Sequence, residues 1–335
     1  MLVTCAGILV ADIIAADLPK ISNPGELTFA PNGIEIHLGG HSGNVSIDLR
    51  KLGLKEGYVS SISAVGKDVF GLFLEEELKK HGVRTYLQKV SNVGTSKNLV
   101  LVVKGEDRRF HVDNGANWFL SPEYVLSIAE KEKPKIFYVG GVGFTGILDE
   151  RLPEVLQKVK DFGSLTFVDP VKPYMHDWNF LLPAMKWMDV FHCNKDEAKQ
   201  ITGKEDPQEA SKVLVDNGVN LVIISLGDKG LIAKTKDETF KMPAFKVSVV
   251  DPTGAGDAFC AGVIFRLLQK AGYKQCNITS LSSEDLIEVL LTGEAAGAAC
   301  VTMVGTTTAV TRENVEKILK EQGEELRRKI EVFPA

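Results

Sequence analysis

The sequence of 335 residues is poor in cysteine and has no long apolar run. Its five cysteines are scattered without a CxxC pair, which argues against a zinc site or a disulfide framework and favours buried thiols in a reducing compartment. No uninterrupted apolar stretch reaches about 18 residues, so we expect neither a transmembrane helix nor a membrane partner. The apolar start, residues 2–10, lacks a preceding basic region and is soon followed by Asp12, which favours a buried first strand over a signal peptide. We therefore expect a cytoplasmic protein. The cysteines are Cys5, Cys193, Cys260, Cys276 and Cys300.

The sequence also lacks a positive net charge and a P-loop. A net charge of −5 offers no general attraction to nucleic-acid backbones, so no nucleic-acid partner is expected. The pattern GxxxxGK[ST] does not occur, which excludes a P-loop enzyme. A hydrophobic content of 44% with 25% charged residues is ordinary for a globular chain, and the length allows one large α/β domain or two smaller ones.

Residues 249–263 combine an apolar strand end, a turn of small residues and the start of a helix. Gly254, Ala255 and Gly256 carry almost no side chain, so backbone N–H groups there can approach a ligand closely. The first N–H groups of a helix lack internal partners and the helix dipole favours negative charge, so this turn suits an anion. Asp257 follows directly, where a carboxylate would repel a simple anion but could deprotonate a hydroxyl beside a phosphoryl group.

The same residues allow a simpler interpretation. Asp251 or Thr253 could cap the helix, and Asp257 could merely interact favourably with its dipole, since such caps are common. Local physics alone leaves both interpretations open.

The stretch resembles the C-terminal signature of the ribokinase-like (PfkB) family of carbohydrate kinases. In that family the amides of the Gly-Ala-Gly turn form an anion hole and the following Asp is the catalytic base. The resemblance therefore implies an anion hole at Gly254, Ala255 and Gly256, and a general base at Asp257.

The amino-terminal third is similar to the substrate side of the same family. Gly39 and Gly40 resemble its hinge beneath the substrate, and Asn44 matches a substrate-binding Asn. Asp12, at the end of the first predicted strand, matches an Asp that binds substrate hydroxyls, a role that suits a carboxylate because it accepts two hydrogen bonds. Without the resemblance, Asp12 would be a turn residue and the glycines a plain helix start.

From residue 134 onward, predicted strands and helices alternate, which indicates a parallel sheet with helices on both faces. Between residues 84 and 114 the pattern changes to short strands, with a hairpin turn at residues 105–107. The resemblance implies a ribokinase-like three-layer αβα fold with a mostly parallel central sheet, forming one α/β domain over residues 1–335. It also implies a small β-sheet lid from segments of about 15–38 and 84–114, and a homodimer through that lid.

The nucleotide side shows a second motif. Asn194 and Glu197 lie on one face of a predicted helix start, where they could hold a hydrated Mg²⁺ or form a capping box with each other. They resemble the NxxE motif of the family, which implies that they organise Mg²⁺ and the phosphates of ATP. A turn after the strand 221–224 is similar to a nucleotide-contacting loop, and its expected ATP contacts are Ser225, Gly227 and Gly230.

Two further patterns concern ligands. Asp251 and Thr253, with backbone from about 299–306, match the place where many relatives bind a monovalent cation, so the resemblance implies a K⁺ site. Residues 141–146 form a GxGxxG pattern after a strand, and a later strand ends in Asp169, at the spacing of a dinucleotide fold. The pattern favours an NAD-dependent oxidoreductase, but it lies in mid-chain and leaves Asp257 without a role.

We therefore predict an ATP-dependent kinase that phosphorylates a hydroxyl of a sugar or sugar-like molecule. His41 stands where ribokinases commonly carry Lys, and residues 140–143 lack the acid that ribokinases use on the sugar. Both departures leave a nucleoside, a ketohexose or an inositol-type polyol as alternative substrates. A non-catalytic ligand-binding relative and an NAD-dependent oxidoreductase are the alternatives from other classes.

Overall fold

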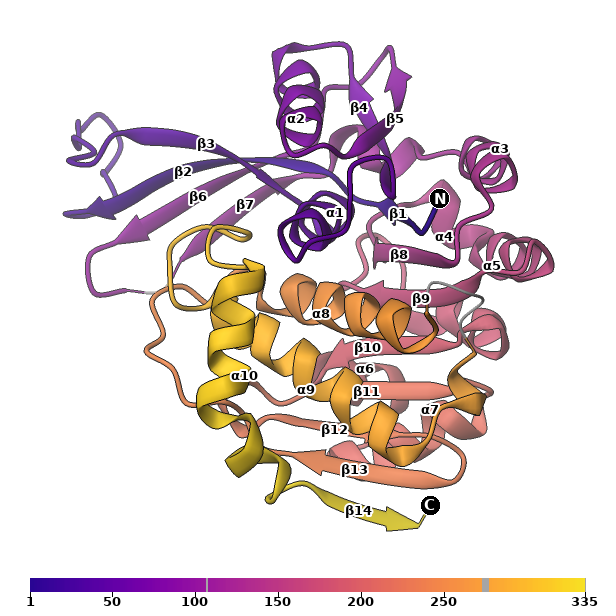
Figure 1. Cartoon of the computed structure of the whole chain (residues 1–335). Coiled ribbons are helices and arrows are strands. Elements are labelled where there is room, and N and C mark those ends of the chain that lie inside the picture. The colour runs from indigo at the N-terminus through magenta and orange to yellow at the C-terminus, as the bar shows by residue number, and fades with distance from the viewer. Residues whose placement is uncertain (107, 273–276, 335) are drawn as a thin grey trace.

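The computed structural model describes residues 1–106, 108–272 and 277–334. Two sheets organise these residues: a ten-stranded sheet in the order β14-β13-β12-β11-β10-β9-β8-β1-β4-β5, and a four-stranded sheet in the order β3-β2-β6-β7 (Figure 1). Neighbouring strands from β5 to β11 run parallel, whereas β12, β13 and β14 pair antiparallel. The predicted mostly parallel central sheet is confirmed. 

The strands of the large sheet are β1 (Val3–Gly7), β4 (Val59–Gly66), β5 (Arg84–Val90), β8 (Ile136–Val142), β9 (Leu165–Pro170), β10 (Val190–Asn194), β11 (Leu221–Ser225), β12 (Leu231–Lys234), β13 (Glu238–Met242) and β14 (Glu331–Pro334). Those of the small sheet are β2 (Val10–Leu18), β3 (Ile34–Gly39), β6 (Lys97–Val103) and β7 (Arg109–Asp113). The α-helices are α1 (His41–Lys51), α2 (Val69–Lys80), α3 (Pro122–Glu132), α4 (Ile147–Glu150), α5 (Leu152–Asp161), α6 (Lys195–Thr202), α7 (Pro207–Asp216), α8 (Ala255–Lys270), α9 (Ser283–Cys300) and α10 (Arg312–Arg327). The 3₁₀ helices are η1 (Gly115–Phe119), η2 (Trp178–Trp187), η3 (Gly227–Lys229) and η4 (Ile278–Ser280).

Alternating side chains of the large sheet build a core on each of its faces. Val3 and Cys5 of β1 pack with α1, α8, α9 and α10, whereas Ala6 packs with α3, α5, α6 and α7 on the opposite face. This alternation gives the helix–sheet–helix layers seen in Figure 1. None of the described helices is long and apolar enough to cross a membrane.

The predicted first strand over residues 2–10 is wrong, because the chain changes sheets there. β1 ends at Gly7, whose φ of 127° is open only to glycine, and a Cβ at this position would lie 1.9 Å from the carbonyl oxygen of Gly140. The chain then enters β2, which extends into the small sheet. Asp12 therefore lies inside β2 of the small sheet and not at the end of the first strand.

The small sheet projects from the edge of the molecule beside α1 and α10 (Figure 1). The predicted hairpin is formed by β6 and β7, with Asp107 of its turn outside the described residues. Residues 84–90, which precede it, form β5 at the edge of the large sheet. Of the cysteines, Cys5, Cys193, Cys260 and Cys300 are buried free thiols, and Cys276 lies outside the described residues.

Candidate active site

Asp257 lies in the first turn of α8 and is only 9% exposed. Asn44 Nδ2 donates a hydrogen bond of 2.8 Å to Asp257 Oδ2, whereas Oδ1 has no hydrogen-bond partner within the described residues. Burial raises the pKa of Asp257 above its ordinary value of 3.8. A carboxylate with one fixed and one free oxygen, and with a raised pKa, is suited to accept a proton from a neighbouring group.

The amide of Asn44 is itself held in one orientation. Thr306 Oγ1 donates to Asn44 Oδ1 at 2.9 Å, which leaves Nδ2 to face Asp257. His41 Nε2 lies 4.0 Å from Asp257 Oδ1, on the side of the free oxygen. Three separate chain segments therefore meet around one carboxylate.

The turn before Asp257 is open to an anion. Helix α8 begins at Ala255 with Gly254 as its N-cap, and no side chain caps it, so the capping role considered for Asp251 or Thr253 is wrong. Gly254 has a φ of 82°, and a Cβ there would lie 2.8 Å from Thr306 O. Within the described chain, no acceptor pairs with the amides of Gly254, Gly256 and Asp257, whereas that of Ala255 bonds to Pro252 O at 3.4 Å. 

Asp12 lies near the same carboxylate, on β2. Asn98 Nδ2 donates to Asp12 Oδ1 at 2.8 Å, and burial raises the pKa of Asp12 to about 6. A Cβ on Gly39 would lie 2.1 Å from Asp12 Oδ2, and one on Gly40, with φ 89°, would lie 2.7 Å from Ile8 O. Gly39 therefore lets the Asp12 carboxylate pack against the end of β3, and Gly40 lets the turn into α1 pass close to the backbone of Ile8.

A cavity of about 450 Å³ opens between the small sheet and the core, and Asp12 lines it. The small sheet contributes a largely apolar wall to this cavity. Asp251 and Thr253 form part of the opposite side, together with the loop that carries Thr306. The apolar wall includes Ile14, Val100, Val102 and Phe110.

A second cleft, of about 720 Å³, lies on the other side of the anion turn. The turn between β11 and β12 lines it together with Ala255 and Gly256 of α8. Phe259, Gly297 and Ala298 add a flat wall of helix surface from α8 and α9. All three predicted nucleotide contacts, Ser225, Gly227 and Gly230, lie in this cleft.

Asn194 and Glu197 form the capping box that was the alternative to a metal role. Asn194 Oδ1 accepts from the amide of Glu197 at 2.9 Å, and Glu197 Oε2 accepts from the amide of Asn194 at 2.9 Å. Burial raises the pKa of Glu197 to about 7, and no hydrogen bond within the described residues uses its Oε1. A partly buried carboxylate oxygen without a partner fits a hydrated Mg²⁺, so the capping box and an ion are compatible.

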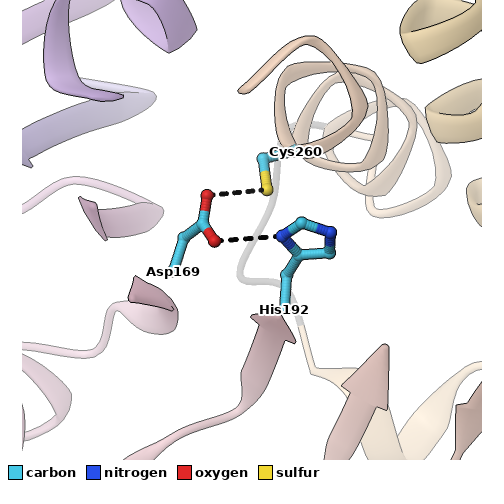
Figure 2. Close-up of side chains that lie close together, drawn as sticks. All are labelled: Asp169, His192 and Cys260. Atoms are coloured by element: carbon cyan, nitrogen blue, oxygen red, sulfur yellow. Dashed lines mark hydrogen bonds and ion pairs between the residues drawn. The ribbon is translucent and has the colours of Figure 1, made fainter. Parts of the chain in front are cut away.

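Sequence reasoning missed a buried polar cluster beneath the anion turn. Figure 2 shows the Asp169 carboxylate facing both the Cys260 thiol and the His192 imidazole. His192 Nδ1 lies 3.0 Å from Asp169 Oδ1, and Tyr138 and Cys260 donate to Oδ2 at 3.0 and 3.5 Å. Although burial opposes charge, the pairing lowers the pKa of Asp169 and raises that of His192. A Cβ on Gly256 would lie 3.5 Å from His192 Cε1, so the imidazole of the ion pair lies close beneath the turn.

The ligand atoms of Asp169, His192 and Cys260 lie within 4.8 Å of one another, as do those of His41, Asp169 and Asp257. In the first group, both carboxylate oxygens of Asp169 already have hydrogen-bond partners, His192 and Cys260. The sequence offers no local signal for this cluster, because its members come from β8, β9, β10 and α8. The only sequence signal for His41 is its departure from a family pattern.

The GxGxxG turn does not form a dinucleotide site. The amides of Gly143 and Thr145 each donate at 3.0 Å to the buried carboxylate of Asp149, so this turn already binds an anion from its own chain. Asp169, the proposed ribose ligand, is buried and paired with His192. The oxidoreductase alternative is therefore wrong.

Several known proteins are similar to this chain in sequence and in structure. Residues 2–313 match a family model described as pfkB family carbohydrate kinase. The chain is 28% identical over 245 residues to an ATP-dependent 6-phosphofructokinase of Thermoanaerobacterium thermosaccharolyticum, covering 70% of this chain and 73% of that protein. It is 26% identical to a ribokinase of Haemophilus influenzae, covering 95% and 98%. A solved ribokinase of Thermotoga maritima superimposes with a TM-score of 0.78 at 25% identity, covering 96% and 99%.

Proposed function

The chain belongs to the pfkB family of carbohydrate kinases, and we propose that Asp257 is the base with which it phosphorylates a hydroxyl of a sugar or sugar-like molecule, using ATP. One observation carries the assignment of the base. The buried Asp257 carboxylate has one oxygen fixed by Asn44 and the other free, and it lies directly after amides that lack acceptors within the described residues. A base and an anion hole side by side are what phosphoryl transfer to a hydroxyl requires.

The acceptor hydroxyl would lie at Oδ1 of Asp257, with the rest of the substrate held by Asp12, Asn44 and the Gly39-Gly40 turn. Its proton moves to Asp257 as the hydroxyl oxygen attacks the γ-phosphorus, and ADP leaves with the electron pair of the broken bond. The amides of the turn at Gly254, Ala255 and Gly256 would face the charge that develops on the transferred group, with that of Ala255 exchanging its long bond to Pro252 O for one to this group. The Asp169–His192 pair would keep this turn in place.

ATP would lie in the cleft lined by Ser225, Gly227 and Gly230, with its phosphates reaching the anion turn. Asn194 and Glu197 would hold Mg²⁺ through water and the free Glu197 oxygen, and the ion would neutralise phosphate charge. The flat wall formed by Gly297 and Ala298 leaves room for a planar base.

The small sheet would act as a lid over the acceptor, within one ribokinase-like domain that spans residues 1–335. Its strands reach over the cavity that contains Asp12, so closing the lid would exclude water from the reacting groups. Exclusion of water matters here because water at Oδ1 of Asp257 would compete with the acceptor.

The apolar wall of Ile14, Val100, Val102 and Phe110 favours a second candidate substrate within this class. A free pentose is polar on all sides and would leave these side chains facing water. An acceptor that carries a ring system beside its sugar, such as a nucleoside, would cover them and gain hydrophobic stabilisation.

The experiment that tests the function is an ADP-release assay with Mg-ATP over a panel of sugars, polyols and nucleosides. We expect one acceptor class to raise ADP release far above the rate with ATP and water alone. A preference for nucleosides over the corresponding free sugars would support the apolar wall as a recognition surface. No turnover with any acceptor, while ATP still raises the Tm, would favour a non-catalytic binding protein.

We also propose a homodimer through the outer face of the lid. Strand register places Ile13, Ile36 and Leu99 on the face opposite Asp12, with Ile34 two residues before Ile36 on β3, and Ile36 also borders the cavity. Ile34, Ile36 and Leu99 are 65%, 47% and 42% exposed, an apolar patch that a second copy would cover. Light scattering should give twice the chain mass for the wild type and the single mass for Ile34→Lys. A monomeric wild type would contradict this proposal.

The cytoplasm remains the proposed compartment. Support comes from the four described cysteines, which are free and buried, as expected for a protein that folds where thiols stay reduced.

A further inference from the structure

Asp251 is where the family resemblance implies a K⁺ ion, yet the chain supplies a cation of its own there. Arg108 Nη1 donates to Asp251 Oδ1 at 2.8 Å. Arg108 belongs to the connection between β6 and β7 of the small sheet, whereas Asp251 lies three residues before the N-cap of α8. Their side chains are 23% and 19% exposed, so this ion pair is partly shielded from water and salt.

The Asp251 carboxylate has further donors besides the guanidinium. Its Oδ1 also accepts from the amide of Thr253 at 3.0 Å and from Thr253 Oγ1 at 2.6 Å, and the amide of Gly305 lies 3.5 Å from Oδ2. Although burial opposes charge, these donors and Arg108 keep the pKa of Asp251 below its ordinary value. The carboxylate is therefore ionised and already coordinated by positive and dipolar groups.

Carbonyl oxygens around Asp251 are also engaged. The Cys300 thiol has one proton to share between Thr253 O at 3.4 Å and Thr306 O at 3.2 Å. Val301 O accepts from the amides of Val250 at 2.7 Å and Asp251 at 3.2 Å. An alkali ion needs several oxygens turned toward it, and these oxygens are turned toward N–H, S–H or guanidinium donors instead.

A second internal cation lies just beyond this segment. The Lys51 ammonium of α1 donates to Thr308 O at 2.9 Å and also to Thr307 O. Arg108 thus lies on the carboxylate where the resemblance implies a bound ion, and Lys51 lies on the carbonyls just beyond that segment. The donor set therefore does not fit K⁺.

We propose that Arg108 replaces the monovalent cation of this site, so that the positive charge on Asp251 arrives with the lid instead of with an ion from solution. The role of this site in catalysis rests on the proposed function, whereas the contact between Arg108 and Asp251 does not depend on it. Arg108 is a positioning residue: it holds Asp251, which holds Thr253, which immediately precedes the anion turn. A guanidinium suits this task because it stays charged and binds carboxylates through a fixed fork of donors.

A lid-borne cation links two events that a soluble ion would leave separate. When the small sheet lies over the acceptor, Arg108 reaches Asp251 and the segment before Gly254 is fixed. When the sheet moves away, Asp251 loses its counter-charge and the anion turn loses that support. The anion turn would thus be fully ordered only while the acceptor is covered, which limits phosphoryl transfer to water.

The test compares the Tm of three proteins in KCl and in choline chloride at equal ionic strength, each with and without Mg-ATP. The proteins are the wild type, Arg108→Gln, and the matched control Arg109→Gln, which removes the neighbouring arginine that pairs with Glu106 inside the lid. The wild type and the control should show no K⁺-specific shift. Arg108→Gln should be less stable in choline and should gain about 2–4 °C in KCl, because K⁺ can now reach Asp251.

A K⁺-specific rise in the Tm of the wild type would overturn the proposal, and so would an Arg108→Gln protein that responds to K⁺ no more than the control. If Arg108→Gln does not fold, Arg108→Lys keeps the charge and should remain insensitive to K⁺; a K⁺ response in that variant would equally count against the proposal. None of these readouts requires turnover, so they stay informative if the ADP-release assay finds no substrate. Where it does find one, the same cation pattern should appear in kcat.

Discussion

Asp257→Asn is expected to lower kcat by about 10²–10⁴-fold while leaving the affinity for ATP nearly unchanged. The amide can still pair with Asn44 or keep its place beside the anion turn, but it cannot accept a proton from the acceptor hydroxyl. ADP release with the best acceptor of the panel measures the first effect, and the Tm shift with Mg-ATP measures the second. Glu313→Gln is the matched control, since Glu313 is an exposed acid in the first turn of a different helix, α10.

The raised pKa of Asp257 also leads to predictions on stability and on the pH dependence of the rate. Burial raises that pKa, so the folded protein binds the proton more tightly than the unfolded chain does, and stability is lost as the pH rises through the raised value. At neutral pH, Asp257→Asn should therefore be at least as stable as the wild type. In the wild type, log kcat/KM should fall with slope one on the acid side, with a midpoint above 3.8. Substantial turnover in Asp257→Asn would remove the base assignment.

Asp149→Ala is expected to have the largest effect on stability, lowering the free energy of unfolding by about 3 kcal/mol or more. The substitution removes the acceptor of two buried backbone amides, Gly143 and Thr145, and of the Thr145 hydroxyl. Each buried donor left without a partner costs about 1–3 kcal/mol. Urea unfolding, monitored for the wild type and the variant, measures the difference.

Glu150→Ala is the matched control, because Glu150 is the exposed neighbour of Asp149 on the same short helix. It should change stability by no more than about 0.5 kcal/mol. Equal unfolding midpoints for the two variants would show that the Gly-rich turn does not depend on the Asp149 carboxylate. Loss of stability in Asp149→Ala alone would explain why this turn has the sequence of a dinucleotide motif without that function.

Much of the fold could be predicted because its signals are local. The alternation of strands and helices after residue 134 is visible in the periodicity of apolar residues, and the helix starting at Ala255 follows from its turn of small residues. The split of the first strand could not be predicted, because apolar residues continue without interruption across Gly7. What divides β1 from β2 is the close approach of Gly140, which is more than 130 residues away in the sequence.

The residues of the site divide in the same way, into those with a local sequence signal and those that depend on distant contacts. Asp257 and Asn44 belong to short motifs that resemble a family's signatures, so they could be named in advance, although the hydrogen bond between them could not. Thr306, Arg108 and His192 each act through a partner on another element, and no local pattern surrounds them. The GxGxxG turn shows the opposite problem, a clear local signal that predicts the wrong ligand. Its glycines suit an anion, but the anion is Asp149, three residues beyond Gly146.

The position of β1 has a consequence for how the chain acquires its structure during synthesis. This strand precedes β4 and β8 in the chain and so leaves the ribosome before them, yet it lies in the interior of the large sheet between these two strands, paired with residues 59–62 and 136–140. The apolar side chains of Val3 and Cys5 must therefore wait until more than 130 further residues have been made. During that interval they are candidates for chaperone binding, and the large sheet can close only late in translation.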